Sequence, residues 1–433
     1  MTRGRLTFDP WRATPGGGEA IIKFIHAADI HLDSPLRGLD RYEGAPVAEC
    51  RGAARRALEN LVRLAIEEKV AFVLIVGDLY DGDWPDYNTG LFFGLQMDKL
   101  RAHQIKVVLI RGNHDAQNKM TRDLRLPDNV HLLSEAAPET LPLDPYRVMI
   151  HGQSFATQAV TDNLAKTYPD RARGWFNIGM LHTSVNGREG HEHYAPCTLD
   201  DLRARQYQYW ALGHIHKPEK LYQNDPVIAF SGNIQGRHVG ESGAKGCLLV
   251  TVDDDHEVVA VEPRALDVVR WTTCRLDAAG ALDGDDLLGR FRDRLVADWL
   301  PAAEDRLLAL RVEVTGRCKA HAALAANWPR WTAEIRQTAN AAGDGRVWVE
   351  KVVSRTRPEV VLDDAADGPL AELAAFLAEL SADDDRLREF CDSELGDLRK
   401  KLDPDLLADL DPRALLDQVG PLLRSRLNAR AGA

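Results

Sequence analysis

The chain has 433 residues, which is more than one ordinary core accommodates, so two or three domains are expected. Its 54 basic and 66 acidic residues leave a net charge of −12, and the overall field of such a protein does not steer it toward nucleic acid. This balance argues against a role in coating polyanions, but it is compatible with a local basic groove or with metal ions that attract phosphate. No stretch approaches the ~20 apolar residues of a membrane span.

Cysteine usage and the first residues indicate the compartment. Six cysteines occur singly, without a CxxC pair, which is typical of a reducing compartment and predicts no structural zinc site. Residues 1–20 lack the apolar core of a signal peptide. We therefore expect a flexible leader at 1–20 and a cytoplasmic protein.

The sequence is organised around residues 70–83, VAFVLIVGDLYDGD. The apolar run 70–76 has the length and composition of a strand buried on both faces of a parallel sheet. It stops at Gly77-Asp78, which places the carboxylate of Asp78 at the rim of the sheet, where open α/β sheets bind their ligands. Asp81 closes the same motif, GD-x-x-D.

Two neighbouring predicted strands end in the same way. The strand 21–30 closes with Asp29 and His31, whose i, i+2 spacing points both side chains to one side and makes half of a metal site. Standing alone, this pair would be a capping aspartate and a surface histidine. The strand 106–110 is followed by Asn113, His114 and Asp115, and Asp115 is expected to orient the His114 ring.

Helical spacing over 49–69 and 88–103 links these strands into βαβ units. Further along, the strand 176–181 ends at His182, and the strand 209–212 runs into GHIH, with His214 and His216 on one side of the backbone. A glycine-rich loop, 232–246, then carries Arg237, His238 and Lys245. Its composition suits either the approach of a phosphate or a hairpin with solvated charges.

Seven residues of metal-ligand type thus lie at the ends of five apolar strands: Asp29, His31, Asp78, Asn113, His182, His214 and His216. Mixed carboxylate, imidazole and carbonyl ligands suit manganese, iron or zinc better than magnesium alone. Two ions bridged by Asp78 would lie ~3.5–4 Å apart and would activate a water for in-line displacement at phosphorus. His114 is the candidate to donate to the phosphate or to protonate the leaving oxygen.

The ordered series D-x-H, GD-x-x-D, GNHD, H and GH-x-H over residues 21–260 resembles the calcineurin-like metallophosphoesterase superfamily. This resemblance implies one metal held by Asp29, His31, Asp78 and His216, and a second held by Asp78, Asn113, His182 and His214. It also implies that His114 is the catalytic histidine. We expect two divalent ions, most readily manganese, and take His114, Asp115 and Asp81 as the catalytic residues and Arg237 and His238 as substrate contacts.

Further motifs resemble one branch of the superfamily. Phosphoprotein phosphatases carry an arginine where this chain has Gly82, whereas FIHAADIHLDSPL and GNIQGRH resemble DNA-repair exonucleases of the YhaO type, similar to the SbcD nuclease subunit. In that branch a second domain caps the active site, and C-terminal helices dock on an SMC-like ATPase. One position departs from the branch, because SbcD-like nucleases carry a histidine where this chain has Asp81.

The expected fold is α/β: a metallophosphoesterase β-sandwich flanked by helices (21–268), a small α+β capping domain (269–356), a linker (357–369) and a helical partner-binding region (370–433). The tail from residue 367 holds 15 acidic and 9 basic residues. An apolar stripe runs along its first helix and continues after Pro404; its members are Leu370, Leu373, Phe376, Leu377 and Leu380, then Leu402, Leu406, Leu407 and Leu410. This stripe fits either the capping domain or a partner.

The function predicted is that of a metal-dependent phosphodiesterase acting on DNA, as an exonuclease or endonuclease in the processing or repair of double-strand breaks. Its expected partners are DNA, an SMC-like coiled-coil ATPase and, as an option, a second copy of the chain, with no membrane. The alternatives are a small-molecule phosphodiesterase or nucleotide pyrophosphatase and, less favoured, a scaffold without catalysis. The intact ligand set argues against the scaffold.

Overall fold

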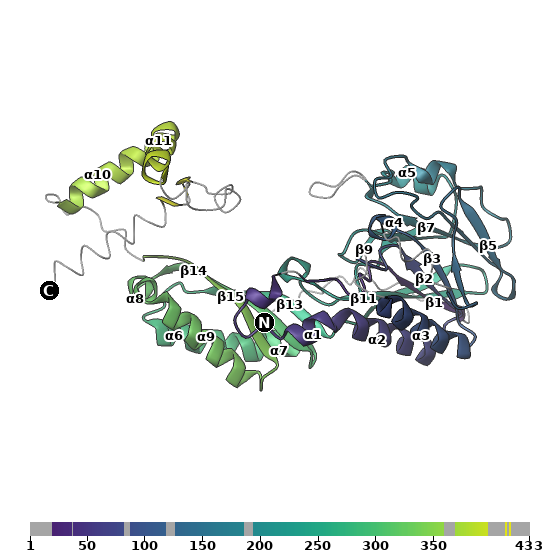
Figure 1. Cartoon of the computed structure of the whole chain (residues 1–433), viewed down its shortest axis with the longest axis horizontal. Helices are drawn as coiled ribbons and strands as arrows, with labels where there is room; N and C mark the ends of the chain where they lie inside the picture. Colours follow the sequence, from purple (N-terminus) through teal and green to yellow (C-terminus); the bar gives the residue numbers. More distant parts are fainter. Residues whose placement is uncertain are drawn as a thin grey trace, which may run out of the picture. The chain divides into compact units, whose positions relative to one another are not determined.

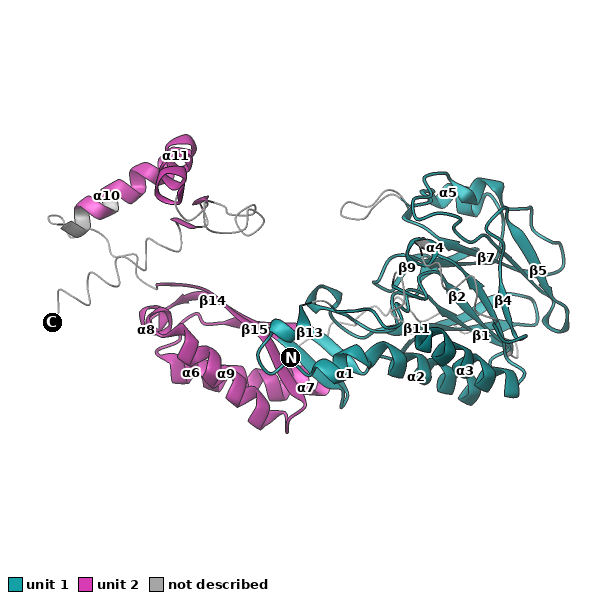
Figure 2. Ribbon diagram, viewed as in Figure 1, with its two compact units in different colours: residues 1–272, 303–310 teal, residues 273–302, 311–433 magenta. Residues whose placement is uncertain are grey.

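The computed structural model describes residues 20–36, 38–81, 87–117, 126–185, 194–358, 369–396, 412–413 and 415–416. The chain divides into two compact units, unit 1 with residues 1–272 and 303–310, and unit 2 with residues 273–302 and 311–433 (Figure 2). The expected leader up to residue 19, most of the expected linker and most of the tail after residue 396 lie outside the described residues, as does Gly82.

The first sheet of unit 1 has six strands in the order β12-β11-β1-β2-β3-β4. Figure 1 labels β1, β2, β3 and β11 of this sheet. Their bounds are β1 (Ala20–Ala27), β2 (Phe72–Val76), β3 (Lys106–Ile110), β4 (Val130–Leu132), β11 (Gly246–Asp253) and β12 (Val258–Ala265). Strands β1 to β4 pair in parallel, and β11 pairs antiparallel with both β1 and β12. The carboxyl ends of β1, β2 and β3 therefore meet at one edge.

The second sheet of unit 1 also has six strands, in the order β5-β6-β7-β8-β10-β9. Their bounds are β5 (Glu139–Leu143), β6 (Val148–Gly152), β7 (Phe176–His182), β8 (Tyr209–Gly213), β9 (Glu219–Tyr222) and β10 (Val227–Phe230). Strands β6, β7, β8 and β10 are parallel neighbours, while β5 and β9 are antiparallel edge strands. Here too the parallel strands bring their carboxyl ends to one edge.

The two sheets pack face to face. One apolar cluster joins them, with Phe24 and Leu74 from the first sheet against Ile178 and Tyr209 from the second. All five residues of β2 are buried, because a second cluster covers the outer face of the first sheet with α2 (Ala53–Glu67) and α3 (Asn88–Ala102). The predicted sandwich flanked by helices is confirmed.

Shorter helices complete unit 1. They are the α-helices α1 (Val47–Arg51), α4 (Asn113–Gln117) and α5 (Leu199–Arg203), and the 3₁₀ helices η1 (Leu39–Arg41), η3 (Asp144–Tyr146), η4 (Leu164–Thr167) and η6 (Val239–Glu241). Helix α5 begins with a capping box, in which Thr198 accepts from the backbone N–H of Asp201 and the Asp201 carboxylate accepts from that of Thr198. This helix lies beside the outer face of the second sheet, where Leu202 joins Trp210 and Phe230 in a third cluster.

Residues 269–358 form a three-stranded sheet, β13 (Val269–Asp277), β14 (Leu307–Cys318) and β15 (Val347–Pro358), in that order. Between the strands lie α6 (Gly284–Arg294), the π-helix η7 (Leu295–Trp299), α7 (Leu300–Ala303), α8 (His321–Ala326) and α9 (Trp328–Ala342). Phe291 of α6 and Ile335 of α9 are fully buried. The division of the chain between residues 272 and 273 falls inside β13.

Two helices of the tail are described, α10 (Pro369–Ala382) and α11 (Asp384–Glu394). Leu380 of α10 packs with Leu387 and Cys391 of α11. Phe376 and Phe390 remain 39% and 40% exposed, with ring centroids 5.7 Å apart. The described helices include none that is both long and apolar enough to cross a membrane.

Candidate metal centre

Five parallel strands supply the seven predicted ligands. Asp29 and His31 follow β1, Asp78 follows β2, and Asn113 follows β3. His182 is the last residue of β7, and His214 and His216 follow β8. Because these ends meet at the rim of the sandwich, residues separated by more than 180 positions become neighbours.

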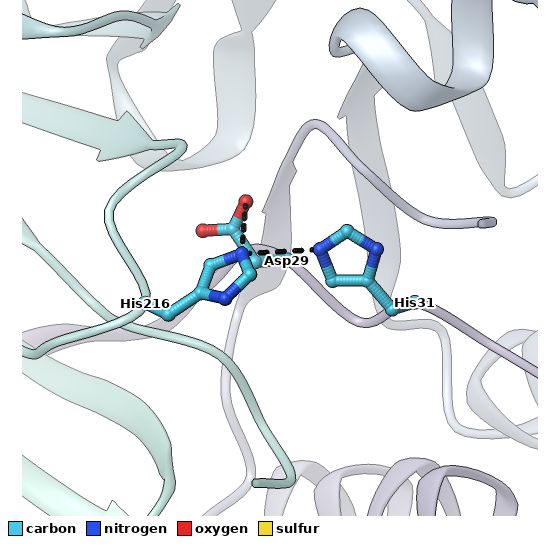
Figure 3. A group of neighbouring side chains, drawn as sticks. All are labelled: Asp29, His31 and His216. Atoms are coloured by element: carbon cyan, nitrogen blue, oxygen red, sulfur yellow. Dashed lines mark hydrogen bonds and ion pairs between the residues drawn. The ribbon is translucent and has the colours of Figure 1, made fainter. Parts of the chain in front are cut away.

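The first donor group consists of Asp29, His31 and His216 (Figure 3). The Nε2 atoms of His31 and His216 lie 3.1 Å apart, and the Nε2 of His216 lies 3.9 Å from Oδ1 of Asp29. Asp29 and His31 are buried, and His216 is partly exposed. The group therefore opens to solvent on the side of His216.

The second donor group consists of Asp29, Asp78 and His182, all buried. The Nε2 of His182 lies 3.5 Å from Oδ2 of Asp78 and 3.0 Å from Oδ1 of Asn113. The same Oδ2 of Asp78 lies 3.9 Å from the Nε2 of His31, which belongs to the first group. Asp78 thus stands between the two groups, in the position that a bridging ligand requires.

His214 contributes differently. Its backbone N–H donates to both carboxylate oxygens of Asp29, at 3.1 and 3.0 Å. Its ring packs against that of His182, with centroids 5.3 Å apart. Among the described residues, none of the groups of acidic and imidazole donors includes His214.

The backbone around these ligands is strained. Asp29, His31, Asp78 and His214 all have positive φ, of 51°, 46°, 50° and 98°. Such a conformation costs a non-glycine residue roughly 1–3 kcal/mol and persists only where the surroundings enforce it. Hydrogen bonds from the N–H groups of Asp29 and His31 to the carbonyls of Gly77 and Asp78 enforce it here, at 3.1 and 3.0 Å.

Two motif glycines permit the close approach of the strand ends. Gly77 has φ +81°, and a Cβ at this position would overlap the imidazole of His182. A Cβ at Gly112 would overlap Oδ1 of Asp78. The glycines of GD and GNHD are therefore needed to bring the ligands together.

The donors fit divalent cations. Two ligands on one ion at ~2.1 Å are roughly 3.0–3.4 Å apart when the angle between them is octahedral or tetrahedral, and the closest observed pairs lie at 3.0 and 3.1 Å. In the described part of the chain, neither Asp29 nor Asp78 forms an ion pair with lysine or arginine. Burial raises the pKa of Asp29, so its charged form is costly unless a cation compensates it.

His114 forms a third donor group with His31 and Asp78, and Asp81 lies beside it. The Nδ1 of His114 is 2.9 Å from Oδ1 of Asp81, and His114 is partly exposed. This hydrogen bond raises the pKa of His114. Burial by itself would raise the pKa of Asp81, but His114, His31, Ser34 and Arg237 together lower it. The contact therefore favours the charged form of each partner.

The sequence predicts that Asp115 orients the His114 ring, and this detail is wrong. The carboxylate of Asp115 instead accepts from the backbone N–H groups of Leu79, Tyr80 and Gly112, at 2.9–3.1 Å. These bonds fix the loop after β2 to the loop after β3. Burial and the neighbouring Asp78 raise the pKa of Asp115 to about 6.

The glycine-rich loop brings Arg237 to the centre. Its guanidinium lies 3.4 Å from Asp81 and 3.1 Å from Glu241, and it is partly buried. His238 is 64% exposed and accepts from the N–H of Gly240, outside the donor groups. The Nζ of Lys245 donates to the carbonyl of His216 at 2.7 Å.

Glu241 and Ser34 are site residues that the motifs do not reveal. The buried carboxylate of Glu241 lies 2.7 Å from Nδ1 of His216 and also accepts from Asn233 and the N–H of Arg237. A carboxylate on the second ring nitrogen orients a metal-binding histidine and increases its basicity. Ser34 donates to Asp81 at 2.6 Å. A hydroxyl three residues after the D-x-H motif is a weak signal for Ser34, and the loop 232–246 gives no signal that separates Glu241 from its neighbours.

Two packed sheets with carboxylate and imidazole donors at the ends of parallel strands are the features of a metallophosphoesterase. Residues 22–218 match the model of the calcineurin-like phosphoesterases, and residues 271–357 match that of the middle domain of the metallophosphoesterase YhaO. Residues 22–218 are therefore similar to the calcineurin-like phosphoesterases.

A curated relative is the uncharacterized metallophosphoesterase YhaO of Bacillus subtilis (strain 168), 36% identical over 263 residues. The match covers 60% of this chain and 64% of that protein, slightly under two thirds of its length. Among solved structures, a dimetal phosphatase from Danio rerio is 13% identical with a TM-score of 0.34, covering 55% of this chain and 94% of its own. GAP50, the anchor in the inner membrane complex of Plasmodium, is 10% identical with a TM-score of 0.33, and the match covers 57% of this chain and 89% of GAP50.

Replacement of Asp78 tests its position between the two donor groups. Protein purified with manganese should approach two equivalents per chain, and Asp78→Ala should lose more than one, because the change removes a donor common to both ions. Elemental analysis measures both values. Asp200→Ala, at an exposed position of α5, is the matched control, and retention of both ions in Asp78→Ala would contradict the arrangement.

Replacement of Glu241 tests the support of His216. Glu241→Gln keeps the shape of the side chain but removes its charge, and we expect about 10–100-fold weaker binding of one metal ion. A calorimetric titration with manganese measures this change in affinity. Glu139→Gln is the control, because it alters a similar pair, His131–Glu139, that lies outside the donor groups. Equal affinities in wild type and Glu241→Gln would rule out the supporting role.

Proposed function

We propose that this chain is a metal-dependent phosphodiesterase that hydrolyses DNA with manganese as its native metal. The observation that carries the proposal is the position of the Asp78 carboxylate between two donor groups, with His114 and Asp81 beside them. Two bound cations would supply Lewis acidity, which makes a water more acidic and neutralises negative charge on a phosphate. The remaining tasks fall to side chains of the chain itself.

His114 is placed to act on the phosphate. Its backbone N–H donates to Oδ1 of Asp78 at 3.0 Å, so its Cα is fixed beside the centre, while Asp81 holds the ring by Nδ1. The Nε2 is left to donate to a phosphate oxygen or to protonate the leaving group. Ser34 and Arg237 both bind Asp81 and fix its orientation. Asp81 and Arg237 therefore position His114.

DNA is proposed as substrate because the motifs FIHAADIHLDSPL and GNIQGRH resemble those of DNA-repair exonucleases. Residues 271–357, which are similar to the YhaO middle domain, lie in the position of the expected capping domain. A role in the processing or repair of double-strand breaks, and a cytoplasmic, nucleoid-associated location, would follow from that substrate. The second candidate is a small-molecule phosphodiesterase or nucleotide pyrophosphatase. The observation that favours it is the contact between Asp81 and His114. At the position of Asp81, SbcD-like nucleases carry a histidine.

One assay separates the two candidates. The full chain is incubated with manganese and either linear double-stranded DNA or bis(p-nitrophenyl) phosphate, with Asp78→Ala as the background. Cleavage of both substrates supports the DNA phosphodiesterase. Hydrolysis of the small diester alone supports the second candidate, and hydrolysis of neither overturns the enzymatic proposal.

His114→Ala tests the catalytic role of the imidazole. Turnover of the small diester should fall by about 10²–10⁴-fold, because a general acid is removed. The metal content should stay at its wild-type value, since the backbone N–H that binds Asp78 is retained. Elemental analysis provides the control: His114 lies with His31 and Asp78 in a third donor group, and loss of metal from the variant would make it a ligand instead.

For the partner, we propose an SMC-like coiled-coil ATPase that docks on the tail. Support comes from the exposed rings of Phe376 and Phe390 and from the exposed acidic residues Glu372 and Asp383 of the same helical segment. An apolar helix face surrounded by negative charge suits a groove with a basic rim. A second copy of the chain is also proposed as a partner, and the exposed Leu91 and Leu95 on one face of α3 support it.

Deletion of residues 370–433 tests the ATPase. Metal content and hydrolysis of the small diester should not change, whereas co-purification with the ATPase and ATP-stimulated DNA cleavage should be lost. Phe376→Asp combined with Phe390→Asp should reproduce that loss, and Leu282→Asp, at another exposed apolar position, should not. An insoluble or metal-free truncation would place the tail in the core and end the partner proposal.

A further inference from the structure

A polar hollow lies at the opposite edge of the second sheet from the metal centre. It has a volume of about 310 Å³ and is lined by Arg171, Ala172, Arg173, Gly174, Trp175 and Gln208. The first five residues form the loop that leads into β7, whose other end carries His182. The seven residues of β7 span roughly 20 Å, so the hollow is separate from the donor groups.

Buried side chains hold this loop in one conformation. The fully buried Asn177 accepts from the N–H of Ala172 at 2.7 Å and donates to the carbonyls of Ala172 and Trp175 at 3.0 and 2.7 Å. Arg147 donates to the carbonyl of Gly174 at 2.9 Å. A loop fixed in this way presents its side chains at little further cost in conformational entropy.

The same hydrogen bonds leave the hollow with donors. The carbonyls of Ala172, Gly174 and Trp175 are already occupied, and Oε1 of Gln208 accepts from the N–H of Asn177 at 2.8 Å. The amide nitrogen of Gln208 and the two guanidinium groups are donors on the lining. A lining of donors selects a ligand rich in acceptors.

Charge favours an anion as well. Arg171 and Arg173 are exposed, and within the described ranges neither forms an ion pair with a carboxylate. The nearby Asp170 lies 4.0 Å from Arg205. These two arginines, two positions apart and without a carboxylate partner among the described residues, contrast with the net charge of −12 of the whole chain.

We propose that this hollow binds a nucleotide unit, with its phosphate between Arg171 and Arg173 and its base against Trp175. Guanidinium groups bind phosphate oxygens in pairs, and an aromatic face accepts any base by stacking. The volume of the hollow is in the range of small-molecule sites. The unit comes either from a free nucleotide or from a nucleic-acid strand, and the inference does not rest on the proposed function.

The test uses the full chain in EDTA, so that the metal centre does not contribute. Binding of AMP and inorganic phosphate is measured by calorimetry, and binding of fluorescein-labelled dT₁₀ by anisotropy. Arg171→Glu with Arg173→Glu should weaken AMP binding at least about tenfold. Arg41→Glu with Arg63→Glu makes the same charge change elsewhere in unit 1 and should leave it unaltered.

Trp175 separates a nucleotide site from a phosphate site. Trp175→Ala should weaken AMP binding about tenfold and leave phosphate binding unchanged, while Trp175→Phe should retain AMP. If the variant Arg171→Glu with Arg173→Glu melts at a lower temperature than the wild type, the test uses Arg171→Gln with Arg173→Gln instead. Tighter binding of dT₁₀ than of AMP, lost in the arginine variants, identifies a strand as the source, and equal binding identifies the free nucleotide.

Three results overturn the proposal. They are no binding of AMP or dT₁₀ by the wild type at millimolar concentration, an equal loss in the control variant, and a Trp175→Ala variant that binds AMP as the wild type does. Binding of a poly-glutamate peptide with the same dependence on Arg171 and Arg173 would also overturn it, because the ligand would then be an acidic protein.

Discussion

The candidate metal centre depends on two buried carboxylates that have no lysine or arginine partner among the described residues. Asp29 and Asp78 are held inside the rim of the sandwich by backbone N–H groups and imidazoles, and transfer of a carboxylate out of water is unfavourable unless positive charge compensates it. The surrounding backbone adopts positive φ to hold them there. The buried charge and the strained backbone both cost free energy, and a bound cation would offset that cost. The donors are arranged as the binding of a cation requires.

Most of the scaffold could be predicted from the sequence because it depends on local patterns. The apolar run before Asp78 predicts a strand with both faces covered, and β2 is buried along its whole length. The strand before Asn113 was predicted with the bounds that β3 has. Residues at the ends of parallel strands meet by topology alone, so the donors could be placed near one another without knowledge of any distance.

Contacts made by loops could not be predicted in the same way. Asp81 takes the contact with His114 that the sequence analysis gave to Asp115, because Asp115 turns toward three backbone N–H groups. Glu241 reaches His216 only because the glycine-rich loop folds back over the centre. Sequence spacing contains no information about such folding back, since it depends on packing between distant segments.

The two donor groups draw their members from both sheets of the sandwich. His31 comes from the first sheet and His216 from the second, 185 positions later in the chain. An ion held by both would act as a reversible cross-link between the layers, and its binding energy would add to the stability of the folded state, because the unfolded chain cannot assemble the same donors. Metal supply and the integrity of the sandwich are thereby linked, so that a cell short of the metal would hold fewer folded copies as well as fewer active ones.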